Sequence, residues 1–259
     1  MISILAETAQ RPVDPALAQF RTDGYARLGP VLGEPALTLL RDRCDALMRG
    51  ELGTDFFFQH DSATGRYDDL PRGIGWQGPS LSYRKIEKLQ RDPLFLELIT
   101  NEYFGRIARA VYSGPVALYR AVLFNKSAAG GTALPWHQDG GSFWGLSCDP
   151  VLQIWTALDD VPRESGCVQL IPGSHGGLAT RLGGVVPDDV AARARAEENM
   201  IDLPARAGES LLIHNYAWHR SGTNATGLPR RALTFCYISA ETRCLRRKRA
   251  PREFLRVFT

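Results

Sequence analysis

The sequence contains little cysteine, and the cysteines are not arranged as a scaffold. There are five among 259 residues, and no two form a Cys-x-x-Cys pair. An odd number without that spacing argues against a disulfide framework and against a structural zinc knuckle. We therefore expect reduced and mostly buried thiols at Cys44, Cys148, Cys167, Cys236 and Cys244.

Long apolar runs are also missing. No stretch approaches the ~18 to 20 apolar residues that a membrane-spanning helix needs. The segment from Met1 to Glu7 has neither the basic flank nor the apolar length of a secretion signal. We expect a cytoplasmic protein without a membrane partner.

The sequence has no strong excess of one charge, since the net charge is +3, but the charge is unevenly placed. Residues 243–259 contain seven Arg or Lys and a single acidic residue, Glu253. No interleaved aromatic residues or nucleic-acid motif accompany the run from Arg246 to Arg249. We predict a solvated or locally packed basic tail over residues 241–259, and no nucleic-acid partner.

The composition is that of an ordinary globular protein. Hydrophobic residues make up 44% and charged residues 23%, which excludes disorder, a collagen-like structure and a coiled coil. No linker or repeat period marks a boundary between domains. We predict one domain over residues 1–259, with an N-terminal helical part (1–114), a core (115–240) and the basic tail.

Two amphipathic helices are predicted in the N-terminal part. Apolar residues at helical spacing follow Pro35 and stop before Gly50, which predicts a helix over residues 35–49. A second stripe runs from Pro93 to Val111 behind Asp92, a candidate N-cap. Between them, residues 51–84 show no clean period and indicate a long irregular segment that could cover a site.

From residue 115 onward the pattern changes to short β-rich runs separated by turn residues. Several short strands at such spacing indicate a sandwich or barrel, so the fold class is mainly β with flanking helices. A second irregular segment, residues 177–205, is predicted to contain a short helix over 188–198. The predicted strands are Val116–Asn125, Leu152–Leu158, Cys167–Ile171, Ser210–His214 and Arg231–Ile238.

The most informative segment is Leu134-Pro-Trp-His-Gln-Asp. In an extended strand, side chains at i and i+2 share a face, so His137 and Asp139 point the same way. His219, at the mouth of a later turn, can supply a third donor. Two imidazoles and one carboxylate leave open positions on an octahedral ion, which suits non-haem Fe(II) that binds a co-substrate and O₂. A structural zinc site would be closed instead.

Two arginines open the last predicted strand. Arg230 and Arg231 follow a turn rich in Gly, Asn and Pro, eleven and twelve residues after His219. An antiparallel return would bring one guanidinium beside the metal pocket, where its planar fork suits a carboxylate. The other arginine of the pair would point into solvent.

Four segments resemble, in order and spacing, the phytanoyl-CoA dioxygenase family of Fe(II)/2-oxoglutarate oxygenases. The motifs span about residues 119–238, and the N-terminal pattern Phe20-Arg-Thr-Asp-Gly-Tyr is similar too. The resemblance implies a double-stranded β-helix, a cupin-like jelly-roll of two sheets with helices packed against one of them. The segments are Trp136-His137-Gln138-Asp139, Gln153-Ile-Trp155-Thr-Ala-Leu-Asp-Asp160, Gly166-Cys-Val-Gln-Leu-Ile-Pro-Gly173-Ser-His175, and His219-Arg220-Ser221-Gly with Arg230.

The resemblance implies a metal site and an activity. It makes His137, Asp139 and His219 the iron ligands, and Fe(II), 2-oxoglutarate and O₂ the cofactors. The activity implied is a dioxygenase that hydroxylates a C–H bond of a small molecule and releases succinate and CO₂. Related halogenases replace the carboxylate ligand with a small residue, so the retained Asp139 favours hydroxylation, although the same iron site can also desaturate, epimerise or close rings.

The resemblance also implies a co-substrate site. Arg230, favoured over its neighbour by the family spacing, would hold the distal carboxylate of 2-oxoglutarate, and Ser221 would hydrogen-bond the same carboxylate. Trp155 and Gln138 match residues that line the co-substrate pocket. Lys85 matches a lysine that approaches 2-oxoglutarate. Positive charge at Arg84, Lys85 and Arg120 could meet an acidic substrate.

Other histidines and tryptophans have simpler interpretations. His175 stands in the turn Pro-Gly-Ser-His and is expected to serve turn geometry. His214, at the end of an apolar run, is expected to be a core histidine rather than a ligand. Trp136, Trp144 and Trp218 could shape a substrate cavity or fill the core.

Two other classes of protein remain compatible with these residues. One is a cupin-like metalloenzyme, a hydrolase or isomerase, that uses the same three ligands without 2-oxoglutarate; Arg230 and Ser221 would then share no task. The other is a non-catalytic jelly-roll module that binds an anion or nucleic acid through the basic tail.

Overall fold

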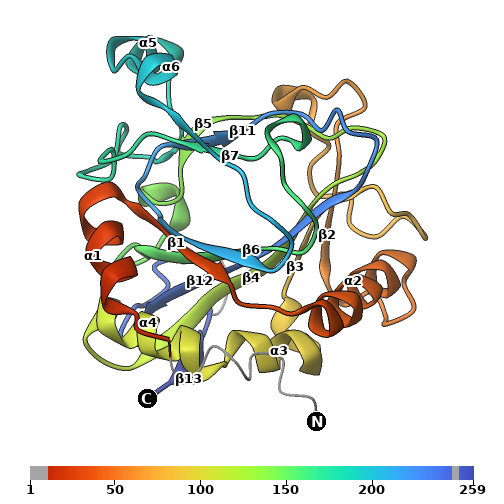
Figure 1. Cartoon of the computed structure of the whole chain (residues 1–259), viewed down its shortest axis with the longest axis horizontal. Coiled ribbons are helices and arrows are strands. Elements are labelled where there is room, and N and C mark those ends of the chain that lie inside the picture. Colours follow the sequence, from red (N-terminus) through yellow and green to blue (C-terminus); the bar gives the residue numbers. More distant parts are fainter. Residues whose placement is uncertain (1–10, 247–250) are drawn as a thin grey trace.

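Two antiparallel sheets face each other in the computed structural model, which describes residues 11–246 and 251–259 (Figure 1). The larger sheet has eight strands in the order β1-β10-β6-β12-β4-β3-β2, with β13 beside β4. The smaller sheet has five, in the order β8-β5-β11-β7-β9. The non-sequential order is that of a jelly-roll, so the predicted fold class is confirmed.

The five strands predicted from the sequence are all present, as β4, β6, β7, β10 and β12. The larger sheet consists of β1 (Tyr25–Pro30), β2 (Phe57–His60), β3 (Tyr83–Glu87), β4 (Val116–Lys126), β6 (Leu152–Ala157), β10 (Glu209–His214), β12 (Arg230–Ser239) and β13 (Leu255–Phe258). The smaller sheet consists of β5 (Leu134–Gln138), β7 (Val168–Leu170), β8 (Gly184–Val185), β9 (Ile201–Leu203) and β11 (His219–Ser221).

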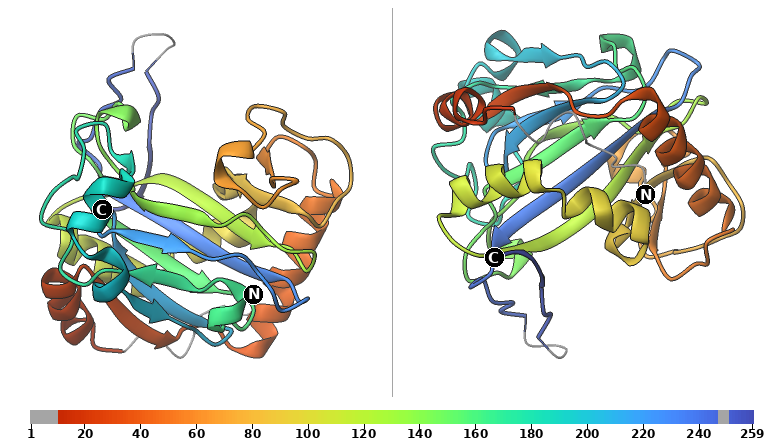
Figure 2. Two further views of the ribbon diagram at one scale, coloured as in Figure 1. Left: turned by 90° about the horizontal axis from the view of Figure 1, so that it is seen from above. Right: turned by 60° about the horizontal axis from the view of Figure 1, so that its bottom comes forward.

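Helices α1 to α4 pack against the larger sheet, and Figure 2 shows the yellow pair α3 and α4 running along its outer face. Helices α5 and α6 lie beside the smaller sheet instead (Figure 1). None of the described helices is long and apolar enough to cross a membrane. The helices are α1 (Asp14–Asp23), α2 (Glu34–Arg49), α3 (Pro93–Ile99), α4 (Glu102–Tyr112), α5 (Asp188–Arg193) and α6 (Ala196–Asn199), with 3₁₀ turns η1 (Tyr67–Asp69), η2 (Leu89–Arg91), η3 (Ser142–Trp144) and η4 (Arg163–Ser165).

Alternation along β6 separates the core from the functional face. Leu152 and Ile154 belong to the apolar cluster beneath the helices, where they are fully buried with Phe95 and Phe104. Gln153 and Trp155 face the opposite way, toward the smaller sheet. The interior between the sheets is therefore available for polar groups.

The predicted helix over 35–49 is confirmed as α2, but the predicted helix over 93–111 is wrong in its length. The first helix ends at Ile99. Asn101 then caps the start of α4, because its side chain accepts a hydrogen bond from the Tyr103 amide at 2.8 Å. Asp92 caps α3 as predicted, through the Leu94 amide. The helix predicted over 188–198 likewise divides into α5 and α6 at residues 194–195.

The N-terminal part is not only helical, which corrects the organisation predicted for residues 1–114. It supplies β1, β2 and β3 to the larger sheet, so that both ends of that sheet come from the first third of the chain. The segment 51–84, predicted to be irregular, contains β2 and the start of β3. Pairing with distant strands overrides the weak local pattern of these segments. For example, β1 pairs with β10 along most of its length.

The C-terminal tail is partly in the fold. β13 pairs with β4, and Phe258 is buried in the helix-side core. The basic run over 246–249 lies outside the described residues except for Arg246, whose Nη2 donates to the Phe143 carbonyl at 2.6 Å.

Candidate active site

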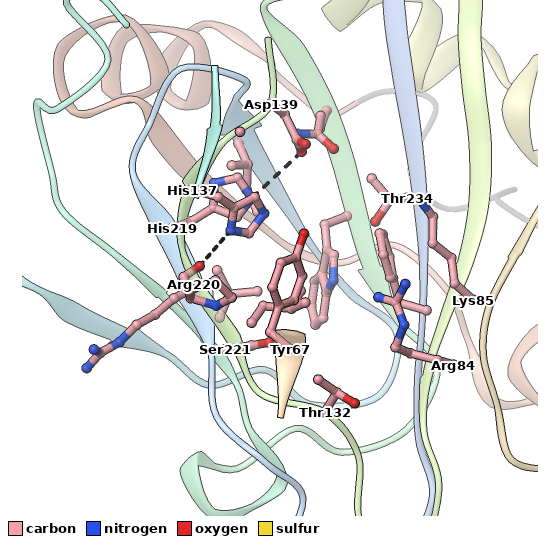
Figure 3. Close-up of a pocket in the computed structure, with 18 of the residues that line it drawn as sticks. Tyr67, Arg84, Lys85, Thr132, His137, Asp139, His219, Arg220, Ser221 and Thr234 are labelled. Atoms are coloured by element: carbon pink, nitrogen blue, oxygen red, sulfur yellow. Dashed lines mark hydrogen bonds and ion pairs between the residues drawn. The ribbon is translucent and has the colours of Figure 1, made fainter. Parts of the chain in front are cut away.

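Three side chains that could hold a metal ion meet in the space between the sheets. His219 on β11 stands directly opposite His137 on β5, and the two imidazole centroids are 4.1 Å apart. Asp139 follows the last residue of β5 on the same face as His137. One ligand atom from each of the three lies within 4.8 Å of the others (Figure 3). The predicted triad is thus brought together by one cross-strand pair and one i, i+2 pair.

Backbone carbonyls select the tautomer of both imidazoles. The Pro135 carbonyl lies 2.9 Å from Nδ1 of His137, and the Ala217 carbonyl lies 2.9 Å from Nδ1 of His219. A carbonyl only accepts, so each Nδ1 carries the proton. In the neutral form of such an imidazole, Nε2 carries the free lone pair that binds a metal.

Asp139 is held from four directions. Arg120 on β4 places Nη2 3.2 Å from Oδ1, and Gln153 on β6 donates through Nε2 to Oδ2 at 2.7 Å. The backbone of Asp139 exchanges hydrogen bonds with buried Asn215, whose carbonyl accepts at 2.7 Å and whose side chain donates at 3.0 Å. The carboxylate is therefore oriented before any ligand binds.

The charge states of the cluster suit a cation. Burial lowers the pKa of His137 to about 4, and the neighbouring His219 adds to the effect. Burial alone would raise the pKa of Asp139, but Arg120 and the two imidazoles hold the pKa of that carboxyl below its usual range. At neutral pH the site presents a neutral His137 and a carboxylate, which a divalent metal requires.

The cluster opens into a cavity of about 340 Å³ between the sheets. Buried arginine and lysine face this cavity. Arg230 is 4% exposed and Lys126 is 5% exposed, and the two stand opposite each other on β12 and β4. Arg230 donates through Nη2 to the Gly166 carbonyl at 2.5 Å, but its buried Nε has no partner. The wall is thus positively charged beside the triad.

Arg230 and Arg231 have different partners. Arg231 points away from the cavity and binds both oxygens of Asp159 at 2.9 Å, and its Nη1 lies 2.7 Å from Asp45 of α2. Arg230 lines the cavity, with its guanidinium 5.7 Å from the centre of the Trp155 ring. The arginine predicted to face the site is the one that does so, but its neighbour is buried in a salt bridge rather than in solvent.

The remaining predicted co-substrate residues fall into two groups. Ser221 and Trp155 are buried and line the cavity with Arg230. Lys85 also lines it, but its Nζ is paired with Glu87 at 2.8 Å. Gln138 borders the cavity while its side-chain amide is occupied by backbone groups of residues 177, 179 and 216, so its amide serves the architecture of the site.

Sequence reasoning missed Gln153, Lys126 and Thr234, and it gave Arg120 a different role. Gln153 shares a face with Trp155 by strand alternation, so its place at Asp139 could have been inferred. The sequence suggests that Arg120 could meet an acidic substrate, but its guanidinium pairs with Asp139. Lys126 and Thr234 face the cavity through strand register, which only the fold supplies.

The other histidines and tryptophans are as follows. His175 lies in a turn and packs against His214 at 4.8 Å between ring centroids. His214 accepts the Tyr216 amide at Nδ1, as a structural histidine does. Trp144 lines the cavity, whereas Trp136 and Trp218 pack in a separate apolar cluster with Ile171 and Val186.

Comparisons with known proteins agree with this geometry. The family described as phytanoyl-CoA dioxygenase matches residues 20–232. Phytanoyl-CoA dioxygenase domain-containing protein 1 of Danio rerio is 30% identical over 195 residues, which are 72% of this chain and 65% of that protein. L-proline trans-4-hydroxylase of Streptomyces griseoviridis is 25% identical over 250 residues, 87% of this chain and 86% of that protein.

A solved structure shows the same fold. EctD from S. alaskensis with bound Fe aligns with a TM-score of 0.72 and 19% identity, covering 98% of this chain and 89% of that one. A jelly-roll with two histidines and a carboxylate at a cationic cavity defines the class of Fe(II)- and 2-oxoglutarate-dependent oxygenases. Within that class, the chain belongs to the phytanoyl-CoA dioxygenase family.

Proposed function

We propose that His137, Asp139 and His219 hold Fe(II), that Arg230 and Ser221 bind the distal carboxylate of 2-oxoglutarate, and that the enzyme hydroxylates a C–H bond of a small molecule. One observation carries the proposal: the oriented triad and an unpaired buried arginine share one cavity. Neither a hydrolase nor an anion-binding module without a metal needs both.

The residues of the triad fit Fe(II). Two neutral nitrogen donors and one carboxylate are the ligand set of non-haem Fe(II) oxygenases, and three protein ligands leave positions open for small ligands. Their outer hydrogen bonds are in place, since Pro135, Ala217 and Gln153 fix the orientation of the three side chains.

The cationic wall fits 2-oxoglutarate. Burial lowers the pKa of Arg230 to about 10, and no carboxylate of the described residues lies within 4.0 Å of its guanidinium. The Nε of Arg230 and the hydroxyl of Thr234 are buried without a partner, and both line the cavity. An unpaired buried charge is costly, so a carboxylate bound at Arg230 would relieve that cost.

When bound, Fe(II) and 2-oxoglutarate supply the oxidising chemistry that uses O₂ and releases succinate and CO₂. The protein's own residues bind and orient these groups. Arg120 and Gln153 keep Asp139 ionised and aimed at the metal, and Trp155 walls the co-substrate side of the cavity. The segment 51–84 places Tyr67 over the cavity and helps to exclude water.

The dimensions indicate a small substrate. A volume of about 340 Å³ is at the lower end of the ~300–1,000 Å³ usual for ligand pockets, and it must hold 2-oxoglutarate as well. The similarity to L-proline trans-4-hydroxylase makes amino acids the first compounds to test. We also propose that the chain is one domain and has no nucleic-acid partner. We propose in addition that it acts in the cytoplasm, which the free state of all five cysteines supports.

Anaerobic addition of Fe(II) and 2-oxoglutarate to the protein tests the assignment. We expect a visible charge-transfer band, and succinate after air is admitted. The band should be lost in His219→Ala and Asp139→Ala, because each removes one of three ligands. A wild-type protein without the band would reject the function, and a band that survives in both variants would reject the ligands.

A further inference from the structure

Arg84 is directed into the cavity by an irregularity in β3. Tyr83 pairs with His60 and Lys85 pairs with Gln59, so two steps along β3 oppose one step along β2 and Arg84 is the extra residue of a β-bulge. Tyr83 and Ile86, three positions apart, are both buried in the helix-side core, which regular alternation would not allow. Bulges of this kind re-aim side chains next to active sites.

The bulge places Arg84 and Lys85 together on the cavity side, across from His137 and His219 (Figure 3). In this view Tyr67 stands between Arg84 and the two histidines. The guanidinium of Arg84 is held by one hydrogen bond, from Nη2 to Oε1 of Gln59 at 2.7 Å. Its Nε is buried without a partner. The side chain of Arg84 is therefore held in place, but most of its hydrogen-bond donors have no partner among the described residues.

Ion pairing divides the arginines and lysines of the cavity into two groups. Six basic residues and a single acidic one, Asp139, line the cavity. Three of the six are paired: Lys85 with Glu87, Arg120 with Asp139, and Arg220 with Glu197. In the described part of the chain, the other three have no carboxylate within 4.0 Å; they are Arg84, Lys126 and Arg230.

The acidic residues that influence Arg84 are already hydrogen-bonded to other groups. Burial lowers the pKa of Arg84, and Asp61 and Glu87 oppose this only from a distance. Asp61 accepts hydrogen bonds from the amides of Ser62 and Thr132 and from the Thr132 hydroxyl. Glu87 accepts from Lys85 and Gln59. The free donors of Arg84 are thus left for a ligand.

Arg84 and Arg230 enter the cavity from strands that are not neighbours. Arg230 and Lys126 face each other on neighbouring strands, so they form one anion site at one end of the cavity. Arg84 is on β3, two strands from β12 with β4 between them. Strands lie ~4.8 Å apart, so the two arginine backbones are separated by roughly 10 Å. Arg84 is therefore a cation separate from the pair on β12 and β4, and its own free donors can meet a second anionic group.

We propose that Arg84 binds a carboxylate of the prime substrate, with the Tyr67 hydroxyl as a second donor. This inference rests on the proposed function, in which Arg230 and Ser221 bind 2-oxoglutarate. A guanidinium with one edge tied to Gln59 offers two parallel N–H groups, which match a carboxylate. The substrate is then a small carboxylic acid whose reacting carbon points away from the acid group, toward the triad.

The test uses the enzyme loaded with Fe(II) and 2-oxoglutarate and a panel of matched probes. The probes are the proteinogenic L-amino acids and small aliphatic and aromatic acids, each beside its primary amide, with small phosphate monoesters as a third arm. Substrate-stimulated succinate release is measured in the wild type, Arg84→Ala and Arg84→Lys. Arg72→Ala removes an exposed arginine from the same 51–84 segment and serves as the matched control.

We expect acids, and not their amides, to stimulate succinate release. In Arg84→Ala the kcat/KM for the best acid should fall by roughly 30-fold or more, because a bidentate charged contact is lost. Arg84→Lys should be intermediate and Arg72→Ala like wild type. The charge-transfer band and the affinity for 2-oxoglutarate should persist in Arg84→Ala, which also shows that this variant is folded.

Several outcomes would overturn the proposal. They are stimulation by amides, stimulation by phosphate monoesters alone, no stimulation by any acid in the panel, undiminished stimulation in Arg84→Ala, or a loss of 2-oxoglutarate affinity in that variant. Absence of the band in the wild type would instead reject the proposed function itself, so the two failures are distinguishable.

Discussion

Arg230 and Arg231 are neighbours in the chain with opposite surroundings. Burial lowers the pKa of Arg230, which has no acidic partner, whereas Asp159 and Asp45 more than offset burial and raise the pKa of Arg231. Arg230 is therefore free to bind an anionic ligand, whereas Arg231 stabilises the fold. Strand alternation sends the two side chains to opposite faces of β12.

The two alanine variants should therefore fail in different ways. Arg230→Ala should weaken 2-oxoglutarate binding by about 2 to 5 kcal/mol, with little loss of stability. Arg231→Ala should keep the affinity but lower the free energy of unfolding by up to about 3 kcal/mol, because Asp159 and Asp45 lose their partner. Titration of the charge-transfer band and urea unfolding measure the two quantities, and a reversed pattern would exchange the roles.

Burial of Lys126 makes the free energy of unfolding depend on pH. Burial, with Arg230 opposite, lowers the pKa of Lys126 from 10.5 to about 7 in the folded protein. The unfolded lysine keeps its proton up to about pH 10. Between these values the unfolded state binds more protons, so this residue makes stability rise as the pH increases from 7.

Comparison with Lys126→Met isolates this contribution. The methionine variant, of similar length, should be more stable than wild type at pH 7 without 2-oxoglutarate, and the difference should shrink as the pH approaches 9. Urea unfolding at several pH values gives the difference directly. If the difference between the two proteins does not change with pH, the amine keeps its proton in the folded cavity.

At the scale of elements, the triad depends on two kinds of neighbour. His137 and Asp139 are neighbours by alternation, which any extended strand provides. His219 joins them because β11 pairs with β5 in a register that puts it opposite His137. The first relation could be predicted from the sequence, and the second could be expected only after the family resemblance supplied the pairing.

The break between α3 and α4 is a local feature that the periodicity hid. The apolar stripe continues across Thr100 and Asn101, yet Asn101 starts a new helix by capping it. Asn101→Ala should lower the free energy of unfolding by ~1 kcal/mol, since an amide at the helix end loses its acceptor. The charge-transfer band should be unchanged.

Glu97→Ala is the control for that variant, because Glu97 is exposed on α3. Its effect on unfolding should stay within about 0.5 kcal/mol. Urea denaturation of both variants measures the two free energies of unfolding. Equal stabilities for the two variants would mean that packing of α3 and α4 on the sheet, rather than the cap, positions this end of α4.

At the scale of the whole molecule, the cavity is assembled from distant parts of the chain. β3 contributes Arg84, β5 and β11 contribute the histidines, and β12 contributes Arg230. The prediction of a helical N-terminal part missed the source of Arg84, since β2 and β3 are short and their Gly- and Pro-rich surroundings weaken the local pattern. Only pairing with β4 makes them part of the larger sheet.

The amino-acid sequence alone determined the fold class, the strands of the core, the i, i+2 relation of His137 and Asp139, and the family, because these depend on local periodicity and on motif spacing. Tertiary structure decided which cations of the cavity have no carboxylate beside them among the described residues, namely Arg84, Lys126 and Arg230. Burial and pairing depend on strand register and on the bulge in β3, and neither can be deduced from residues near in the chain.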